Sequence, residues 1–366
     1  MLIKRLSQLV IAFLAIPFLS EAQVTTSNIS GVVVTEKNEP LVGANVSITY
    51  EPSNYVYKVV SKKGGRFDVS NVPPGGPYSI SVTFIGNGDF KKSDIFIPLG
   101  EKYDIKVEMS PSSTNLQNVV VIGGRKSVSE KTGASTNISR AQITNLPNIS
   151  RAITGVTKLT PQSNGNSFAG MNNRYNNITI DGSLFNNNFG RGGEGFVPGG
   201  ASSAISIDAI DQVQVNIAPF DVRQAGFVGG GVNAVTRRGT NNWYATAFIM
   251  NRGHELYGKK ILNQTVDVSK LSAKTYGGSI GGPIIKNKLF FFVNAEGEKR
   301  TLPGQNWLAK RPGTNDGNPQ LTPVLASDLD QLRTYVNNTY GFDPGIYEGY
   351  NFQTDNFKFL GRIDWV

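Results

Sequence analysis

A ten-residue stretch decides the fold of this chain of 366 residues: Gly230-Gly231-Val232-Asn233-Ala234-Val235-Thr236-Arg237-Arg238-Gly239. The wider segment 226–238 is rich in Gly, which marks turns, and it is predicted to end in a strand. Two more strands are expected on its N-terminal side. Residues 207–215 alternate in polarity, and residues 177–182 run into an Asp-Gly turn. The middle of the chain is therefore predicted to contain several strands.

Loops and short helices are expected around these strands. Between residues 163 and 200, Asn and Gly supply 18 of 38 residues, too many for a packed core, so loops partly ordered by partners are predicted there. Helices are predicted at residues 139–146, opened near Asn137, and at residues 150–157. The extended apolar run 116–125 lies between polar flanks. It is either one more strand or an exposed edge that pairs with a partner's sheet.

Three of these segments resemble the plug domain of TonB-dependent outer-membrane receptors. Residues 176–182 resemble its Asn-x-x-x-x-Asp-Gly strand and turn, residues 210–215 its Ile-Glu-x-Val segment, and residues 230–239 its closing Gly-Gly-x-Ile-Asn-x-x-Thr-Lys-x-Gly signature. Residues 216–224 are similar to the Oar-like branch of this family. Two departures leave the ligand type open: Ile217-Ala218-Pro219 replaces Arg-Gly-Pro, and Gln replaces the strong acid of the Ile-Glu-x-Val strand.

The resemblance implies two sets of site residues. A TonB box, the peptide that pairs with the sheet of the energy-coupling protein, would lie at Gln117, Asn118, Val119, Val120, Val121, Ile122 and Gly123, with the three valines carrying the pairing. Candidates for facing a substrate from the plug loops are Arg174, Tyr175, Phe185 and Phe189. The alternative for these four is that they pack the loops against a barrel wall.

The N-terminal part of the chain has two further regions. Residues 1–22 have the charged, apolar and small-residue zones of a secretory signal peptide, with cleavage expected before Gln23. Short strands are predicted at 29–35, 41–48, 55–61, 66–69, 78–85 and 103–109, separated by Gly and Pro turns, which is typical of a β-sandwich. This region resembles the carboxypeptidase-regulatory-like domain through segments 31–33, 40–46, 65–67 and 72–78.

The C-terminal part reads as transmembrane β-structure. Strands are predicted at residues 243–251, 273–283 and 289–297, and residues 356–365 alternate between apolar and mostly polar side chains. Such alternation is typical of a barrel wall between lipid and lumen. Phe290-Phe291-Phe292 is expected in an interfacial aromatic girdle. The 284–288 turn is expected to be periplasmic, and the 254–272 and 300–355 connections extracellular. A soluble sandwich with long loops is the alternative.

Composition excludes much chemistry. The chain has no Cys and one His, so disulfides, thiolate metal sites, Cys nucleophiles and multi-His metal sites are impossible. Residues 190–195 match Gly-x-Gly-x-x-Gly without a preceding strand, and residues 277–281 match Gly-x-Ser-x-Gly without a later His. His254-Glu255 lacks the second His of a zinc motif. The net charge of +9 comes from scattered Lys and Arg, so nucleic-acid binding is not expected.

The sequence thus predicts a mainly β protein: an N-terminal β-sandwich, an α+β plug domain and an incomplete transmembrane antiparallel β-barrel. The expected divisions are 1–22, 23–110, 111–123, 124–240 and 241–366. Four strands cannot close a barrel, and the family uses about 22, so the sequence is expected to be a fragment or a truncated product.

The resemblance implies energised import through a plugged barrel in the outer membrane, with the N-terminal domains periplasmic or in the lumen. The expected partners are a TonB-type coupling protein, outer-membrane lipid and an unidentified imported substrate. No catalytic, cofactor or metal site is expected. The alternatives are a surface adhesin or binding module without transport and, as a third class, a secreted enzyme.

Overall fold

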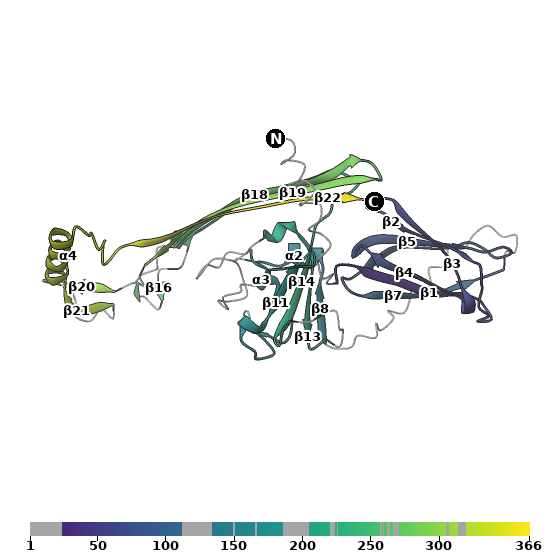
Figure 1. The fold of residues 1–366 in the computed structure, drawn as a ribbon, viewed down its shortest axis with the longest axis horizontal. Helices are drawn as coiled ribbons and strands as arrows, with labels where there is room; N and C mark the ends of the chain where they lie inside the picture. Colours follow the sequence, from purple (N-terminus) through teal and green to yellow (C-terminus); the bar gives the residue numbers. More distant parts are fainter. Residues whose placement is uncertain are drawn as a thin grey trace, which may run out of the picture. The chain divides into compact units, whose positions relative to one another are not determined.

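The computed structural model describes residues 24–111, 134–148, 151–164, 167–185, 205–219, 224, 226–256, 258, 260–261, 264–265, 271–304, 307–313 and 320–366. The described chain is mainly β with few helices (Figure 1). It divides into two compact units: Met1–Thr246 with Ser279–Asn294 and Phe359–Val366, and Ala247–Gly278 with Ala295–Lys358. Within the described ranges, no helix has the length and apolar character needed to cross a membrane.

The N-terminal domain, called the sandwich here, has seven strands in two sheets (Figure 1). Its strands are β1 (Ser27–Thr35), β2 (Asn45–Tyr50), β3 (Tyr55–Val60), β4 (Arg66–Val72), β5 (Gly75–Thr83), β6 (Phe90–Ile97) and β7 (Lys102–Met109). One sheet has the order β4-β1-β7, with β1 and β7 parallel, and the other has the order β3-β2-β5-β6. Alternate side chains of both sheets, such as Val46 and Ile48 of β2 and Ile105 and Val107 of β7, are buried in a common core.

The sandwich contains one strand that the sequence analysis did not predict. Strand β6 was not predicted because its first half, Phe90-Lys91-Lys92-Ser93-Asp94, is mostly polar. Ile95 and Ile97, near its end, are buried in the core, and Phe90 at its start is half-buried against it. β6 is an edge strand of its sheet, and an edge strand needs few buried side chains.

The second domain, called the mixed-sheet domain here, has a five-stranded sheet of order β12-β11-β14-β13-β8. The strands are β8 (Ala134–Ile138), β11 (Asn177–Ile180), β12 (Ser183–Leu184), β13 (Ile210–Ile217) and β14 (Gly230–Thr236). β11 and β14 are parallel, whereas β13 is antiparallel to β14 and β8. Shorter elements are α2 (Arg140–Asn145), α3 (Ile153–Thr157), β9 (Ser163–Asn164), β10 (Ser167–Phe168), η3 (Asn173–Tyr175) and η4 (Ile207–Ala209).

Close packing explains the paired glycines that open β14. A Cβ atom on Gly230 would lie 2.6 Å from the ring of Phe168, and one on Gly231 would lie 2.7 Å from the ring of Phe227. Neither position has room for a larger residue unless an aromatic ring moves. The strand that decides the fold is thus held between two aromatic side chains.

Two local predictions in this domain need correction. Helix α2 is capped by Ser139 rather than opened near Asn137: Ser139 Oγ accepts from the N–H of Gln142, and Gln142 Oε1 accepts from the N–H of Ser139. This reciprocal capping box satisfies two free N–H groups, which fixes the helix start. Residues 207–209 form the 3-10 helix η4 rather than the start of a strand, because Ser206 Oγ accepts from Asp208 N.

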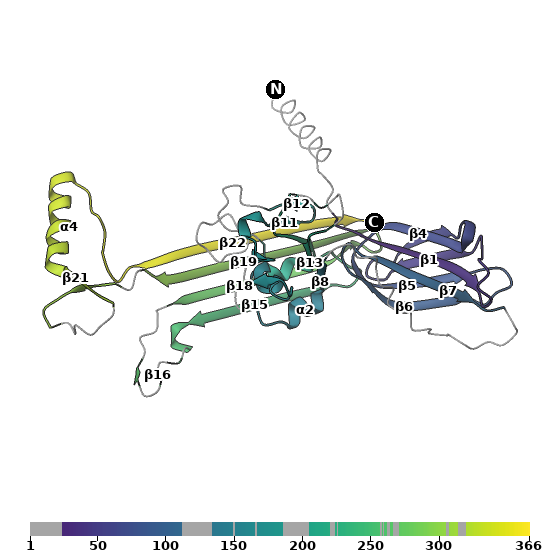
Figure 2. The same cartoon turned by 90° about the horizontal axis from the view of Figure 1, so that it is seen from below.

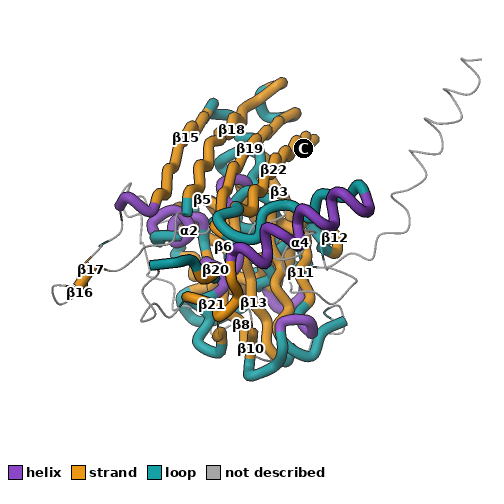
Figure 3. Tube along the Cα trace, turned by 90° about the vertical axis from the view of Figure 1, so that its left-hand side faces the viewer, coloured by secondary structure: helices purple, strands orange, loops and turns teal. Residues whose placement is uncertain are grey.

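The third part is a four-stranded sheet whose strands follow in sequence order, β15-β18-β19-β22 (Figures 2 and 3). They are β15 (Tyr244–Gly253), β18 (Ser272–Ile285), β19 (Leu289–Pro303) and β22 (Asn351–Trp365). β18, β19 and β22 have 14, 15 and 15 residues, more than the roughly 9–11 that a tilted strand needs to span a bilayer. The described strands form an open sheet and no closed barrel.

The connections between these strands are unequal. A short turn joins β18 to β19, whereas longer connections carry η5 (His254–Leu256), β16 (Lys260–Ile261), β17 (Gln264–Thr265), β20 (Leu308–Lys310), β21 (Leu321–Leu325) and α4 (Ala326–Tyr340). Helix α4 was not predicted, because residues 300–355 were taken as one long connection. Its Leu332 and Tyr335 are exposed, so it lacks the buried apolar stripe by which a helix is recognised.

Candidate functional site

Strand β22 reverses the usual polarity of a protein surface. Phe357, Phe359, Ile363 and Trp365 are 67–75% exposed, whereas Lys358 between them is 7% exposed. These are the two faces that the alternation of residues 356–365 predicted. A sheet in water would bury its apolar face, so the arrangement suits a wall with lipid on the apolar side.

The aromatic run of β19 does not form the predicted girdle. Phe290 and Phe292 are almost completely buried, and only Phe291 between them is partly accessible. Strand alternation places the first and third rings on the same face, away from the exposed apolar side. Phe292 instead joins the apolar core of the mixed-sheet domain and stacks on Tyr244, with the ring centroids 6.2 Å apart.

Asp208 is the centre of a polar cluster between the mixed-sheet domain and the four-stranded sheet. Its Oδ2 accepts from Thr246 Oγ1 of β15 and from Ser279 Oγ of β18, both at 2.8 Å. Its Oδ1 accepts from Arg140 Nη2 of α2 at 2.9 Å. Burial alone would raise the pKa of Asp208. The hydrogen bonds from Thr246, Ser279 and Arg140 outweigh burial and lower this pKa.

Arg362 of β22 makes a second polar contact with the mixed-sheet domain. Its Nη1 lies 3.2 Å from Asp181 Oδ1 and 2.8 Å from Thr236 Oγ1. Asp181 Oδ1 also accepts from the main-chain N–H of Thr236 at 3.0 Å, which joins the Asp-Gly turn after β11 to the end of β14. Arg362 is held by Asp364 on its own strand at the same time. Its forked guanidinium can serve these acceptors together.

Arg237 connects the polar cluster to the aromatic side chains. Its guanidinium carbon lies 4.4 Å from the ring centroid of Tyr244 and 5.3 Å from that of Phe292. Its Nη1 donates to Ser279 Oγ at 3.3 Å. Burial lowers the pKa of Arg237 from its ordinary value, but an arginine stays charged at physiological pH. Arg237, near the end of the stretch 230–239, therefore contacts the four-stranded sheet through a hydrogen bond and through cation–π contacts.

This site is suited to holding two parts of the chain together through hydrogen bonds. The carboxylate of Asp208 is engaged by three side-chain donors. Ser279 Oγ lies between Asp208 and Thr246. Within the part of the chain that the structure describes, no group of three or more His, Asp or Glu residues could hold a metal ion.

The predicted site residues are only partly within the described structure. The segment Gln117–Gly123 and Phe189 lie outside the described residues. Arg174 and Tyr175 are exposed on η3, and Phe185 is half-buried against the core of the mixed-sheet domain. Phe185 thus packs within its own domain, which differs from the alternative of packing against a barrel wall. Their role toward a substrate remains a prediction.

Sequence reasoning missed the residues of the polar cluster. Ser279 was considered only within a Gly-x-Ser-x-Gly match and was set aside as a nucleophile. Thr246 and Ser279 are single hydroxyl residues on predicted strands, and nothing in one strand identifies a partner such as Asp208, which is 38 and 71 residues away. The available signal was the polar face of strand 356–365, which includes Arg362.

The chain matches two known families. Residues 28–110 match the carboxypeptidase regulatory-like domain, and residues 235–351 match the outer membrane beta barrel domain. The chain is also 22% identical over 308 residues to the TonB-dependent transporter Oar of Myxococcus xanthus, covering 75% of this chain and 27% of that protein. The chain thus spans about a quarter of the length of this relative.

Two solved structures show weaker likeness. The siderophore receptor PirA from Acinetobacter baumannii is 20% identical, with a TM-score of 0.37 over 48% of this chain and 27% of the other. A hydroxyquinol 1,2-dioxygenase from Pseudomonas putida is 8% identical, with a TM-score of 0.20 over 24% of this chain and 57% of the other. At these TM-scores, neither likeness bears on fold or function.

The two family matches and the transporter relative agree with the reversed polarity of β22 and with the motifs at residues 176–182, 210–215 and 230–239. The chain is therefore an outer-membrane protein related to the TonB-dependent receptors, in which a carboxypeptidase regulatory-like domain precedes an outer membrane β-barrel domain.

Proposed function

We propose that this chain acts as a TonB-dependent transporter that imports a substrate across the outer membrane at the expense of energy from a coupling protein. Residues 124–240 are the plug, and residues 241–366 are the first strands of the barrel. Residues 111–123 are the linker with the TonB box, and residues 23–110 are an accessory sandwich on the periplasmic side or in the lumen.

The observation that carries this proposal is the pair of hydroxyl contacts from Thr246 and Ser279 to Asp208. They attach a compact α+β domain to the polar face of a sheet whose other face is apolar and exposed. Hydrogen bonds to a carboxylate can be exchanged for water at a net cost of about 1.5–3 kcal/mol each. Such a domain can be held firmly at rest and still be released when it is pulled.

The pulling step is assigned to Val119, Val120 and Val121. These residues can add a strand to the sheet of a coupling protein, with main-chain hydrogen bonds supplying the affinity. The candidates for contacting the substrate are Arg174 and Tyr175, exposed on η3, together with Phe185 and Phe189. The relationship to a transporter favours a non-enzymatic role.

A proline substitution tests the proposed coupling. Val120→Pro removes a main-chain N–H from the middle of the TonB-box segment, so strand pairing with the coupling protein should be lost. The purified periplasmic domain of the coupling protein is the probe, and its binding to the detergent-solubilised outer-membrane protein is the measurement. Thr114→Pro, in the same linker but outside the segment, is the matched control.

We expect Val120→Pro to weaken this binding at least tenfold, and deletion of residues 116–123 to abolish it. Thr114→Pro should bind like the unmodified protein. Binding that survives both Val120→Pro and the deletion would show that the coupling protein does not use this segment, and would remove the main support for energised import.

A further inference from the structure

Strand β13 buries both of its faces, and one of them is polar. Val213 and Val215 are fully buried in the apolar core of the mixed-sheet domain. Gln212, Gln214 and Asn216 alternate with them and are only 4–7% exposed. Buried amides need hydrogen-bond partners, and a strand that offers three of them on one face needs a polar surface against that face.

The partners of two of these amides lie in the sandwich. Gln212 Oε1 accepts from the main-chain N–H of Leu99 at 2.9 Å. Gln214 Nε2 donates to the main-chain carbonyl of Leu99 at 2.8 Å. Asn216 Nδ2 donates to Gln214 Oε1 at 3.0 Å, which orients the Gln214 amide so that its donor faces Leu99. The side chains of Gln212 and Gln214 thus bond both the main-chain N–H and the main-chain carbonyl of Leu99.

Residues on the two neighbouring strands, β8 and β14, make similar hydrogen bonds. Gln214 is in register with Asn137 of β8 and with Asn233 of β14, so these three side chains, called the amide row here, share one face. Asn137 Nδ2 donates to Glu101 Oε1, and Asn233 Nδ2 donates to the carbonyl of Val24. Every member of the amide row therefore bonds to a residue of the sandwich or of the segment that leads into it.

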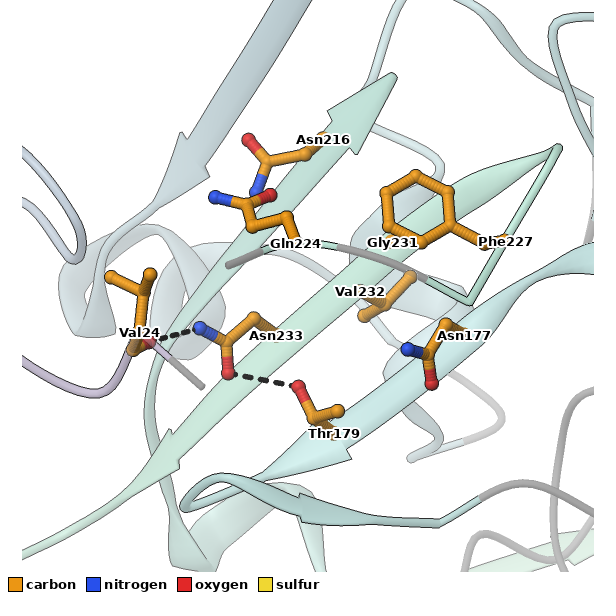
Figure 4. A pocket seen from close by; sticks show the side chains of 9 residues that line it. All are labelled: Val24, Asn177, Thr179, Asn216, Gln224, Phe227, Gly231, Val232 and Asn233. Atoms are coloured by element: carbon orange, nitrogen blue, oxygen red, sulfur yellow. Dashed lines mark hydrogen bonds between the residues drawn. The ribbon is translucent and has the colours of Figure 1, made fainter. Parts of the chain in front are cut away.

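Figure 4 shows Asn233 between Val24 and Thr179. Thr179 Oγ1 donates to Asn233 Oδ1 at 3.0 Å, which leaves the Asn233 amide nitrogen free to donate to Val24. Val24 is 9% exposed and stands one residue after Gln23, the expected first residue of the processed chain. The row thus reaches the start of the sandwich as well as the turn before β7.

Gly100 is fitted to this contact. Its φ of +70° is a left-handed conformation that favours glycine. A Cβ atom on it would lie 3.0 Å from the amide of Gln214 and 3.2 Å from Val24 Cγ1. The turn that carries Leu99 thus approaches the amide row closely because residue 100 has no side chain.

We propose that the amide row, together with Gln212, is a docking site for the Leu99–Glu101 turn, and that it keeps the sandwich and the mixed-sheet domain together as one body. Residues 112–133 also join these two domains covalently, so docking fixes both ends of that segment. One consequence rests on the proposed function: a coupling protein that pulls within residues 117–123 acts on the sandwich and the plug together. The docking itself does not depend on coupling or import.

A pair of isosteric variants on the same strand face tests the docking. A protease site is inserted in residues 124–133 of the purified, detergent-solubilised protein, which is then cleaved without denaturation. Co-elution of the sandwich fragment in size-exclusion chromatography is measured at pH 8. Gln212→Glu keeps an acceptor for the Leu99 N–H, whereas Gln214→Glu replaces the donor to the Leu99 carbonyl with a second acceptor.

We expect the sandwich fragment to stay bound in the unmodified protein and in Gln212→Glu, and to be released from Gln214→Glu. Gln162→Ala, an exposed glutamine of the same domain, is the control and should retain the fragment. Release from the unmodified protein, or equal retention in Gln212→Glu and Gln214→Glu, would overturn the proposal.

A variant in the sandwich tests the docking without changing any residue of the mixed-sheet domain. Asn tolerates a left-handed φ better than most residues, so Gly100→Asn adds a side chain against Gln214 with little backbone strain. We expect it to release the fragment and to raise the hydrogen-exchange rate of the Leu99 amide at least tenfold. The amides of Val213 and Val215 should stay protected. An unchanged Leu99 exchange rate in Gly100→Asn would contradict the docking site.

Discussion

Lys358 and Glu296 form an ion pair on the covered face of the four-stranded sheet, with Nζ 2.8 Å from Oε1 and both side chains almost fully buried. They lie on β22 and β19, which are neighbours in the sheet. On the opposite face of β22, Phe357 and Phe359 are exposed. The strand thus covers its charges and exposes its rings, and this inversion distinguishes a membrane wall from a soluble sheet.

Removing one member of this pair should destabilise the sheet strongly. Lys358→Met removes the ammonium group that pairs with the buried carboxylate of Glu296, which costs about 3–5 kcal/mol, whereas the double variant Lys358→Met/Glu296→Met should recover most of the loss. Samples are incubated at increasing temperatures and then run by electrophoresis without further heating. The temperature at which the band of the folded protein disappears measures the effect. A double variant as unstable as Lys358→Met would show that the pair is not coupled.

The exposed apolar row predicts a cost that depends on depth in the bilayer. Phe359 lies in the inner part of β22, whereas Trp365, on the same face, is its last residue. Arg at a lipid-facing site costs about 2–4 kcal/mol at the bilayer midplane and about 0–1 near the interface. Phe359→Arg should therefore lower the yield of folded protein in outer membranes or lipid vesicles far more than Trp365→Arg. Equal yields would argue that this face does not meet lipid.

Much of the fold was predictable because local patterns follow the period of the strand. The alternation of residues 356–365 gave both faces of β22, and the Asp-Gly turn after β11 followed from its sequence. Elements without such a pattern were missed. Strand β6 begins with polar residues at a sheet edge, and helix α4 has no buried stripe. Phe290 and Phe292 were misplaced because a run of three rings does not say which of them face lipid.

The candidate site was much less predictable, because its contacts join residues distant in sequence. Asp208 meets Ser279, Asp181 meets Arg362, and Gln214 meets Leu99, each more than 70 residues away. One residue pattern did contain information that was not used. The repeat Gln212-x-Gln214-x-Asn216 sets three amides on one strand face, which predicts a polar surface against it although it does not identify the partner.

Replacing Asp208 or Asp211 with Asn should change the stability of the protein in opposite directions. Hydrogen bonds lower the pKa of Asp208, so its contribution to stability is present above its ordinary pKa of 3.8 and is lost as the pH falls through the lowered value. Burial raises the pKa of Asp211 despite the arginines around it, so its charged form opposes folding once the pH rises above the ordinary value.

At pH 7, Asp208→Asn should therefore destabilise the protein by about 1–3 kcal/mol, because it loses a charged partner of Arg140. Asp211→Asn should leave stability unchanged or raise it. Urea unfolding of the detergent-solubilised protein, followed at pH 7 and again near pH 4, measures both. The gap between the two variants should narrow near pH 4, because the penalty from charged Asp211 has then largely disappeared, whereas the contribution of Asp208 is lost only below its ordinary pKa. Equal destabilisation by both at pH 7 would contradict these assignments.

Arg362 should determine how strongly the end of β14 is bound to the four-stranded sheet. Arg362→Ala removes the donor to Asp181 and Thr236, whereas Arg362→Lys keeps the charge but not the fork that serves several acceptors. Hydrogen exchange of the Thr236 amide, which donates to Asp181, is the readout. It should accelerate strongly in Arg362→Ala and by an intermediate amount in Arg362→Lys, while Arg66→Ala in the sandwich leaves it unchanged. If Thr236 stays protected in Arg362→Ala, then Asp181 is ordered by its own turn, and Arg362 does not hold the mixed-sheet domain at this point.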